Sequence, residues 1–235
     1  MKAISLCLWR RPNYTRTVLE SLTRCPEIGT YTIFAGIDGG GDAGVIEELN
    51  NFTACKVVPA IRSQHVGCNE NTRLTLDAAF QESDFVIHLE DDVVVARDAL
   101  RYMEWGRQFD SDKNLFTLSL WRHDKGWLPS NSDKPKPPDT DYIAENGSRF
   151  GVWGWGTWSD RWEEMKRGWT TGGDMEASWD IVLTEKIRNG RCDLSPHCSR
   201  AINIGADLGT HRGEVTVAYW ADSPEFVSPS EYKRV

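Results

Sequence analysis

Three consecutive carboxylates, Glu90-Asp91-Asp92, are the residues of this sequence best suited to chemistry. An apolar run, Phe85 to Leu89, leads into them, and Val93-Val94-Val95 follows at once. Three charges between two apolar runs are costly to bury unpaired, so they lie in a solvated turn or are neutralised by a cation. Carboxylate oxygens suit Mg²⁺ or Mn²⁺, which needs few protein ligands where a diphosphate supplies others. We predict a metal site here, with a solvated acidic turn as the alternative.

Charged residues also follow two earlier apolar runs and begin a later helix. Arg11 comes after the first run, and a guanidinium can bind phosphate in a forked geometry, with a plain surface charge as the alternative. Asp38 precedes three glycines, where it can accept hydrogen bonds from a base or a ribose, or merely favour a tight turn. Asp180 begins a predicted helix, as a general base or as a plain helix cap.

Tryptophan is unusually frequent, with 11 in 235 residues. Trp155 lies among glycines, which let a ligand approach the backbone closely, so we predict that it stacks on a sugar ring. Core packing is an equal alternative, because tryptophan has a large apolar surface to bury. His211 is a candidate second metal ligand, although a histidine in a polar loop is more often simply exposed.

Composition excludes several classes of protein. The net charge is −8 and no Lys/Arg cluster forms a basic stripe, so we expect no nucleic-acid partner. No apolar run of about 18 residues is present, so we expect no membrane span. The start of the sequence continues from a short apolar run into Arg10-Arg11-Pro12, unlike a signal peptide. Six cysteines without a CxxC pair favour a reducing compartment, and we expect a cytoplasmic protein.

Strand-like and helix-like segments alternate through the first half of the chain. The expected strands are 3–8, 31–37, 55–60, 85–89 and 115–120, and the expected helices are 14–22, 42–50, 69–81, 96–109, 160–166 and 179–189. This alternation predicts βαβ units, in a single α/β domain with a mostly parallel open sheet and helices on both faces. Ligands bind at the carboxyl ends of such strands, so the turns at 10–12, 38–40 and 90–92 should gather along one edge.

The domain is expected to have two halves joined by a loop. Residues 1–122 form the first half, which ends with the metal motif and the strand after it. Residues 123–149 lose periodicity around Lys134-Pro135-Lys136-Pro137-Pro138, which predicts a flexible loop, either a flap over the site or an inert excursion. Residues 150–235 form the second half of the same domain.

Several motifs together resemble one enzyme family. A strand followed by Glu90-Asp91-Asp92 resembles the DxD motif of GT-A glycosyltransferases, which have a Rossmann-like fold, and the order of further motifs is most similar to N-acetylglucosaminyltransferase I and its relatives. These further motifs are Leu8-Trp9-Arg10-Arg11-Pro12, Gly36-Ile37-Asp38, Asn71-Thr72-Arg73 in place of a His-x-Arg helix start, Gly154-Trp155, Ser178-Trp179-Asp180, and Gly190-Arg191 with Ser199-Arg200.

The resemblance assigns a role to each of these residues. It implies that Asp92 contacts Mn²⁺ or Mg²⁺ on the donor diphosphate, while Glu90 and Asp91 lie near the donor ribose and sugar. It places Arg11 on the donor, Asp38 on the uracil and Asn71 where the family has a histidine. It makes Asp180 the general base, and some GT-A enzymes take a late histidine, here His211, as a metal ligand.

The implied activity is a metal-dependent, inverting transfer of a sugar from a nucleoside diphosphate-sugar. Residues 1–122 would then be the donor-binding half of the domain, and residues 150–235 the acceptor-side, catalytic half. The resemblance favours a UDP-sugar such as UDP-GlcNAc as donor, and a glycan, glycoconjugate or other hydroxyl compound as acceptor. One alternative is a sugar-phosphate nucleotidyltransferase, although Arg10-Arg11-Pro12 is not the Gly-rich phosphate loop typical of that class. The other alternative is a carbohydrate-binding protein without catalysis, which the tryptophans suggest and which would not need Asp92.

Overall fold

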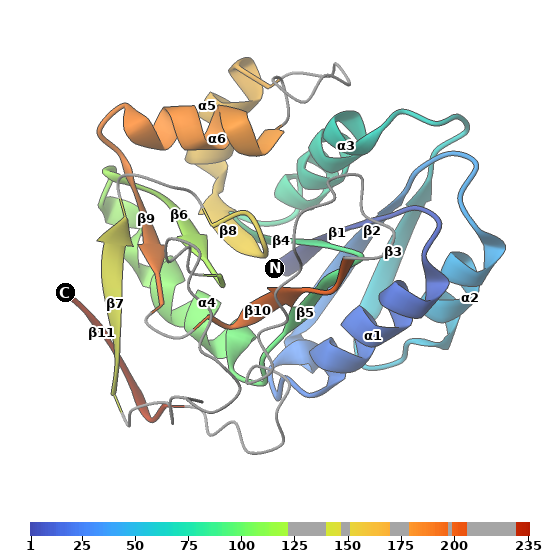
Figure 1. Ribbon diagram of the computed structural model, residues 1–235, viewed down its shortest axis with the longest axis horizontal. Helices are drawn as coiled ribbons and strands as arrows, with labels where there is room; N and C mark the ends of the chain where they lie inside the picture. The colour runs from blue at the N-terminus through green and yellow to red at the C-terminus, as the bar shows by residue number, and fades with distance from the viewer. Residues whose placement is uncertain (122–139, 147–150, 170–178, 197–198, 206–228) are drawn as a thin grey trace.

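A nine-stranded sheet runs through the centre of the protein in the computed structural model (Figure 1). The structure describes residues 1–121, 140–146, 151–169, 179–196, 199–205 and 229–235. The strands of this sheet are β1 (Lys2–Leu8), β2 (Tyr31–Ile37), β3 (Lys56–Ile61), β4 (Phe85–Glu90), β6 (Leu115–Ser119), β7 (Thr140–Asn146), β8 (Trp155–Trp158), β9 (Cys192–Ser195) and β11 (Glu231–Arg234). A separate two-stranded sheet pairs β5 (Val93–Val95) with β10 (Ala201–Asn203).

The helices are α1 (Pro12–Thr23), α2 (Ala43–Asn51), α3 (Cys68–Phe80), α4 (Ala99–Arg107), α5 (Ser159–Arg167) and α6 (Trp179–Arg188), with short 3₁₀ turns η1 (Ile28–Thr30) and η2 (Gln108–Ser111). Two of them begin where the sequence provides a start signal. Pro12 stands at the first position of α1, where its missing N–H costs nothing. Asp42 caps α2 by accepting a hydrogen bond from the Gly44 N–H at 2.7 Å.

The strand order is β11-β7-β9-β6-β8-β4-β1-β2-β3. The strands β3, β2, β1 and β4 pair in parallel, β8 is antiparallel to both β4 and β6, and β9 is again parallel to β6. At the far edge β7 is antiparallel to β9, and β11 runs parallel to β7. The predicted α/β fold with a mostly parallel open sheet is therefore confirmed.

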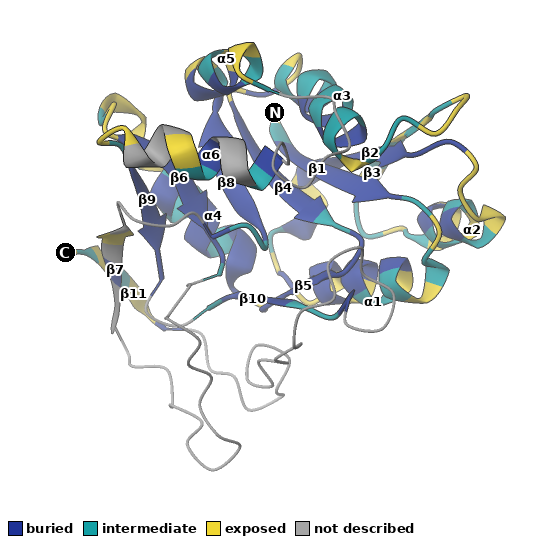
Figure 2. Cartoon of the chain, turned by 45° about the horizontal axis from the view of Figure 1, so that its top comes forward, coloured by how far each residue is buried: buried dark blue, intermediate teal, exposed yellow. Residues whose placement is uncertain are grey.

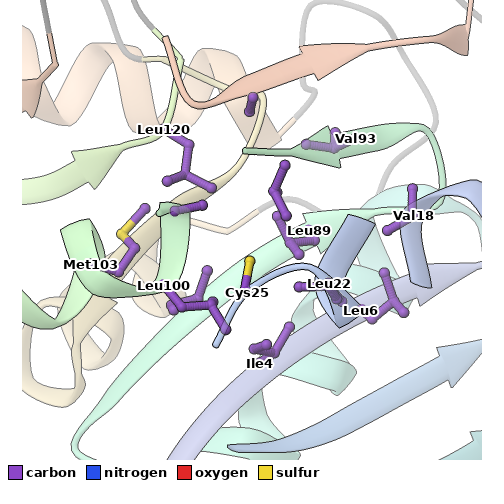
Figure 3. Close-up of a cluster of buried hydrophobic side chains, with 14 of the residues drawn as sticks. Ile4, Leu6, Val18, Leu22, Cys25, Leu89, Val93, Leu100, Met103 and Leu120 are labelled. Carbon is purple, nitrogen blue, oxygen red and sulfur yellow. The ribbon is translucent and has the colours of Figure 1, made fainter. Parts of the chain in front are cut away.

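Helices cover both faces of the sheet, as expected. Alternate residues of β1 enter two separate cores: Ile4 and Leu6 pack with α1 and α4, while Ala3 packs with α3, α5 and α6. Figure 3 shows the first core, in which side chains from β1, α1, α4 and β5 meet. The central strands are buried almost throughout and α2 has an exposed outer face (Figure 2). Both faces of the sheet thus have an apolar covering, which accounts for its continuous hydrophobic runs.

The expected loop at 123–149 is wrong for residues 140–146, which form β7 in the sheet. The sequence of β7 does not alternate apolar and polar residues, so the strand has no hydrophobic period of its own, and Ile143 lies in a core. Its backbone pairs instead with β9 and β11, which come much later in the chain. Residues 123–139 and 147–149 lie outside the described residues, and the division into donor and acceptor halves stays a prediction.

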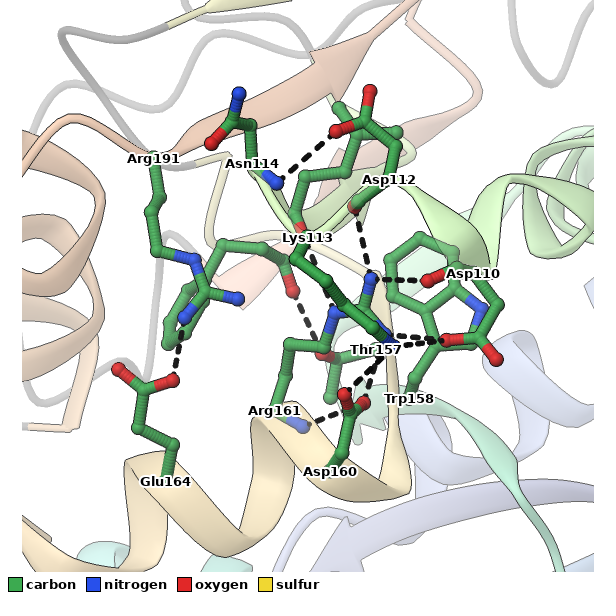
Figure 4. Close-up of polar contacts among 12 residues, drawn as sticks. Asp110, Asp112, Lys113, Asn114, Thr157, Trp158, Asp160, Arg161, Glu164 and Arg191 are labelled. Carbon is green, nitrogen blue, oxygen red and sulfur yellow. Dashed lines mark hydrogen bonds and ion pairs between the residues drawn. The ribbon is translucent and has the colours of Figure 1, made fainter.

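A buried arginine fixes the edge of the sheet at which β4 begins (Figure 4). The Arg161 side chain is fully buried and donates to the backbone carbonyls of Leu115, Asp110 and Asp112 at 2.7–3.2 Å. Its guanidinium also pairs with the carboxylates of Asp110 and Asp160 and lies 4.4 Å from the ring centroid of Trp158. This network joins α5 to the chain that enters β6.

No helix among the residues that the structure describes is long and apolar enough to cross a membrane.

Candidate functional site

Parallel pairing of β1 with β4 brings the first predicted turn against the acidic triplet. Cys7 stands opposite Glu90 in the register, so the chain after each strand leaves the sheet at the same edge. Arg11 there forms a forked pair with Asp91, with Nε 3.1 Å from Oδ2 and Nη2 on Oδ1. Its Nη1 lies 2.9 Å from Asp92 Oδ2. One guanidinium therefore holds both carboxylates, and the predicted meeting of these turns is confirmed.

The two-stranded sheet of β5 and β10 fixes Asp92 from the other side. The Ile204 N–H donates to the Asp92 carbonyl at 2.8 Å, and Asn203 Nδ2 donates to Asp92 Oδ1 at 3.1 Å. Gly205 lies so close that a Cβ there would be 2.2 Å from Asp92 Oδ2. The Asp92 side chain is thus held between Arg11, Asn203 and the backbone of Gly205.

Burial makes this acidic turn electrostatically costly. Burial, and then the neighbouring charges of Asp92 and Asp91, raises the pKa of Glu90 to about 8. Burial also raises the pKa of Asp91 to about 6, against the opposing effect of its bonds with Arg11. For Arg11, burial acts to lower the pKa, but its bonds and charge attraction to Asp91 and Asp92 outweigh this and raise it well above the ordinary value. Arg11 opposes these shifts at Glu90 and Asp91, because a nearby positive charge favours the ionised form of a carboxylate.

Asp38, at the end of β2, is buried and organises the neighbouring loop. Its carboxylate accepts hydrogen bonds from the backbone N–H groups of Gly39, Val66 and Gly67 at 2.7–3.0 Å. His65 Nδ1 lies 2.8 Å from Asp38 Oδ2, with the His65 side chain 56% exposed. The bond to His65 is the one that an incoming ligand could replace most easily.

Asn71 has an internal role, which differs from the predicted contact with a donor. The residue is 3% exposed, and its Nδ2 donates to the Gly36 carbonyl at 2.9 Å while its Oδ1 accepts from Arg62 Nε at 3.1 Å. Gly36 is required for this packing, because a Cβ there would lie 1.9 Å from Thr75 Oγ1. With both amide atoms engaged below the surface, Asn71 has no free group for a nucleotide in this arrangement.

Arg62 is a candidate that the sequence analysis missed. It follows β3 at the same edge of the sheet and donates to two neutral oxygens, Asn71 Oδ1 and Thr75 Oγ1, the latter at 3.2 Å. Among the described residues no carboxylate forms an ion pair with its guanidinium. A half-buried guanidinium held only by neutral acceptors suits an anion such as a phosphate. The one signal in the sequence is an arginine directly after a predicted strand.

Aromatic packing joins the loops after β1 and β3. The Trp9 ring stacks on His65 with centroids 4.7 Å apart, and the Arg10 guanidinium lies 4.2 Å from the Trp9 centroid. Trp9 Nε1 also donates to the Gly39 carbonyl at 3.2 Å. The ends of β1, β2 and β3 are therefore bound into one surface beside the acidic turn.

The first turn of α6, which carries Asp180, lies beside the end of β4. The Trp179 N–H donates to Asn69 Oδ1 at 3.3 Å, and the Trp179 ring packs edge-on against His88 with centroids 5.5 Å apart. The preceding residue, Cys68 at the start of α3, has its Sγ 3.7 Å from Glu90 Oε1. Asp180 therefore belongs to a helix start that is anchored at the acidic edge, and its role as a general base stays a prediction.

The prediction that Trp155 stacks on a sugar is wrong for this structure, because the side chain is fully buried. Pairing of β8 between β4 and β6 places Trp155 inside the second core, next to His88 and Trp179. Trp153 and Trp121 at the same edge are only partly buried, with ring centroids 4.3 Å apart. They are better candidates for contact with a sugar ring than Trp155.

The described residues fit a divalent cation that is shared with a ligand. No three His, Cys, Asp or Glu side chains converge as a metal cage in the described parts of the chain. Mg²⁺ and similar ions are commonly held by one or two carboxylates while phosphates and water complete the shell. The Arg11 guanidinium beside Asp92 Oδ2 shows that this oxygen can take a cationic partner. His211, the second predicted ligand, lies outside the described residues.

Comparison with known proteins identifies the fold. No protein-family model matches the sequence, and a search of curated proteins finds no match. Staphylococcus aureus TarS residues 1–349 is 14% identical over 85% of this chain and 58% of that chain, with a TM-score of 0.55. The same protein in complex with UDP-GlcNAc is 15% identical over 92% and 62%, with a TM-score of 0.58. The mannosyltransferase PcManGT from Pyrobaculum calidifontis, in complex with GDP-Man and Mn²⁺, is 12% identical over 88% and 58%, also at 0.58.

These similarities establish the GT-A fold, as the sequence motifs predicted. The chain spans 58–62% of the length of those three chains. Identities of 12–15% carry the fold and not the activity. The finer resemblance to N-acetylglucosaminyltransferase I stays a prediction from the sequence motifs.

Proposed function

We propose that this protein is a metal-dependent glycosyltransferase that takes a sugar from a nucleoside diphosphate-sugar, preferably a UDP-sugar such as UDP-GlcNAc, and transfers it to a hydroxyl of a glycan or glycoconjugate. The observation that carries the proposal is the contact of Arg11 with Asp91 and Asp92 at the carboxyl ends of β1 and β4 in a GT-A fold. Open α/β sheets bind their ligands at this edge. The complexes of the structurally similar proteins with UDP-GlcNAc and with GDP-Man and Mn²⁺ support the choice of donor class and cation.

In this proposal the donor lies across the ends of β1, β2, β3 and β4. Arg11 and Arg62 supply positive charge for the diphosphate, and Asp38 with Trp9 lies where the base would bind. Asp92 would hold the divalent cation, Mn²⁺ or Mg²⁺, with Glu90 and Asp91 beside the ribose and sugar. When bound, that cation supplies Lewis-acid stabilisation of the charge that develops on the leaving diphosphate.

Asp180 is the proposed general base. It takes the proton from the acceptor hydroxyl as that oxygen attacks the anomeric carbon, and the bond from that carbon to the diphosphate breaks. A single displacement of this kind inverts the anomeric configuration. Replacing Asp180 with Asn should lower kcat by about 10²–10⁴-fold, the usual contribution of a general base, and leave donor affinity unchanged.

The test is calorimetric titration of UDP, GDP and several UDP-sugars, with Mn²⁺ and then with EDTA. The variant Asp92→Asn removes the proposed ligand charge and keeps the size of the side chain. Asp84→Asn is the matched control, because Asp84 precedes β4 at the opposite edge and its side chain is 72% exposed. We expect tight binding of one UDP species that requires the metal and Asp92 and is unchanged in the control.

Two results would count against the proposal. Absence of metal-dependent nucleotide binding in the wild-type protein would remove the transferase hypothesis and favour a carbohydrate-binding protein. A requirement for a nucleoside triphosphate with release of pyrophosphate would identify a nucleotidyltransferase.

A further inference from the structure

Asp92 is held by a segment more than a hundred residues away in the chain, and nothing in the proposed mechanism yet uses that segment. The register of β10 with β5 places Asn203 opposite Val93, the residue that follows Asp92. The backbone of the segment then binds the Asp92 carbonyl through the Ile204 N–H at 2.8 Å. The side chain of Asn203 reaches the Asp92 carboxylate itself.

The two oxygens of Asp92 have different partners. Oδ1 accepts from Asn203 Nδ2 at 3.1 Å, and Oδ2 lies 2.9 Å from Arg11 Nη1. The amide of Asn203 is itself fixed, because its Oδ1 accepts from the Gly205 N–H at 2.7 Å. Asn203 is neutral and its amide is held by the Gly205 backbone, so a cation does not compete with its bond to Oδ1. Arg11 is a charged side chain that a cation can replace.

Gly205 closes the remaining side of the carboxylate. A Cβ on Gly205 would lie 2.2 Å from Asp92 Oδ2 and 3.0 Å from Asn203 Oδ1. The carboxylate therefore cannot swing toward β10, and the bond to Asn203 sets its rotation. Both constraints leave Oδ2 directed toward Arg11 and the diphosphate side of the turn.

We propose that Asn203 is a positioning residue for the cation, because it orients Asp92 so that Oδ2 alone is presented to the metal. Gly205 supports the same orientation by occupying the remaining side of the carboxylate. The inference rests on the proposed function. Partners that orient a metal ligand without touching the metal typically change metal affinity by about 10–100-fold when they are removed.

Two variants test the proposal from opposite sides of the carboxylate. Asn203→Ala removes the hydrogen bond to Oδ1. Gly205→Ala keeps Asn203 and places a methyl group 2.2 Å from the present position of Oδ2, so the Asp92 carboxylate must turn out of the orientation that Asn203 sets. The matched glycine control is Gly29→Ala, where a Cβ would lie 3.7 Å from its nearest neighbour, an ordinary contact.

Mn²⁺ binding is measured on the full chain by loss of the free-ion electron paramagnetic resonance signal, with and without UDP, and UDP binding is measured separately in EDTA. We expect both variants to weaken Mn²⁺ binding in the presence of UDP by about 10–100-fold, with unchanged UDP binding in EDTA. Circular dichroism and thermal melting establish that each variant is folded.

Failure of the positioning role and failure of the proposed function give different results in these measurements. A change in Mn²⁺ affinity of less than about threefold in folded Asn203→Ala and Gly205→Ala would overturn the positioning role, as would an equal loss of UDP affinity with and without metal. If the wild-type protein shows no metal-dependent UDP binding, the proposed function fails first and the inference fails with it.

Discussion

Removal of the Arg11 charge is the perturbation whose outcome the structure constrains most closely. Arg11→Met keeps a long apolar side chain and leaves Asp91 and Asp92 without their shared cation. The carboxylate side chains are only 6% and 10% exposed, so water replaces little of the lost interaction. We therefore expect the folded protein to lose stability in the absence of metal.

The size of this loss of stability follows from the distance between the charges. At an effective dielectric constant of about 20, unit charges 2.9 Å apart attract by roughly 6 kcal/mol. Desolvation of the three groups offsets part of this attraction, and removing one partner of a buried ion pair typically costs about 3–5 kcal/mol. For a domain of this size, about 3 kcal/mol lowers the melting temperature by about 6–12 °C.

The loss of stability in Arg11→Met should depend on pH. Burial raises the pKa of Asp91 to about 6 already, and without Arg11 this pKa rises further above its value in the unfolded chain. The folded variant then binds more protons than the unfolded chain, so its stability falls as the pH increases through that range. The deficit of Arg11→Met should be largest above pH 7 and shrink as the pH is lowered toward 5.

A divalent cation should replace the missing charge. Because it binds the folded state, Mn²⁺ stabilises the variant by RT ln(1 + [Mn²⁺]/Kd), and by more than it stabilises the wild-type protein, in which Arg11 competes for Asp92. Thermal melting with EDTA and with Mn²⁺ across a pH series measures both effects. Arg16→Met is the control, because its pair with Glu48 is exposed and should melt close to the wild type. A variant that melts like the wild type in EDTA, with no rescue by Mn²⁺, would refute the reasoning.

Two further predictions concern buried groups away from the donor site. Burial raises the pKa of Asp193 to about 7, so the folded protein keeps a proton that the unfolded chain releases, and stability falls as the pH increases from about 4 to 7. Asp193→Asn should flatten that slope, measured by urea unfolding at several pH values; an unchanged slope would contradict the assignment. Arg161→Met leaves buried carbonyl groups without a donor and should cost about 3–5 kcal/mol in unfolding free energy, with UDP affinity unchanged because the network lies at the opposite edge of the sheet.

The first half of the fold could be predicted from the sequence because its signals are local. The runs that became β1, β2, β3 and β4 are apolar and bounded by turns, and the helices between them have apolar faces. Parallel strands connected in this way bring their carboxyl ends together. The contact of Arg11 with Asp91 and Asp92 is the direct consequence, although the residues are 80 and 81 positions apart.

The second half could not be predicted in the same way, because its strands depend on partners that are distant in the chain. The segment Thr140–Asn146 does not alternate apolar and polar residues, and its pairing with β9 and β11 decides its conformation. Trp155 is a single residue whose burial likewise depends on strands that are distant in the chain. Glycine neighbours make it look accessible, but the placement of β8 between β4 and β6 buries it, while Trp153 stays partly exposed.

The roles proposed for Arg11 and Asn203 can be separated because they act on different oxygens of Asp92. Loss of Arg11 removes a competitor from Oδ2, so metal binding without nucleotide should strengthen while the metal-free protein becomes less stable. Loss of Asn203 releases Oδ1 and leaves the charge balance unchanged, so metal binding should weaken with little effect of pH on stability. Opposite changes in Mn²⁺ affinity from two neighbours of one carboxylate cannot arise from a general loosening of the turn. Such a loosening would weaken Mn²⁺ binding in both variants. The geometry around Asp92 requires instead that Mn²⁺ affinity increases in one variant and decreases in the other.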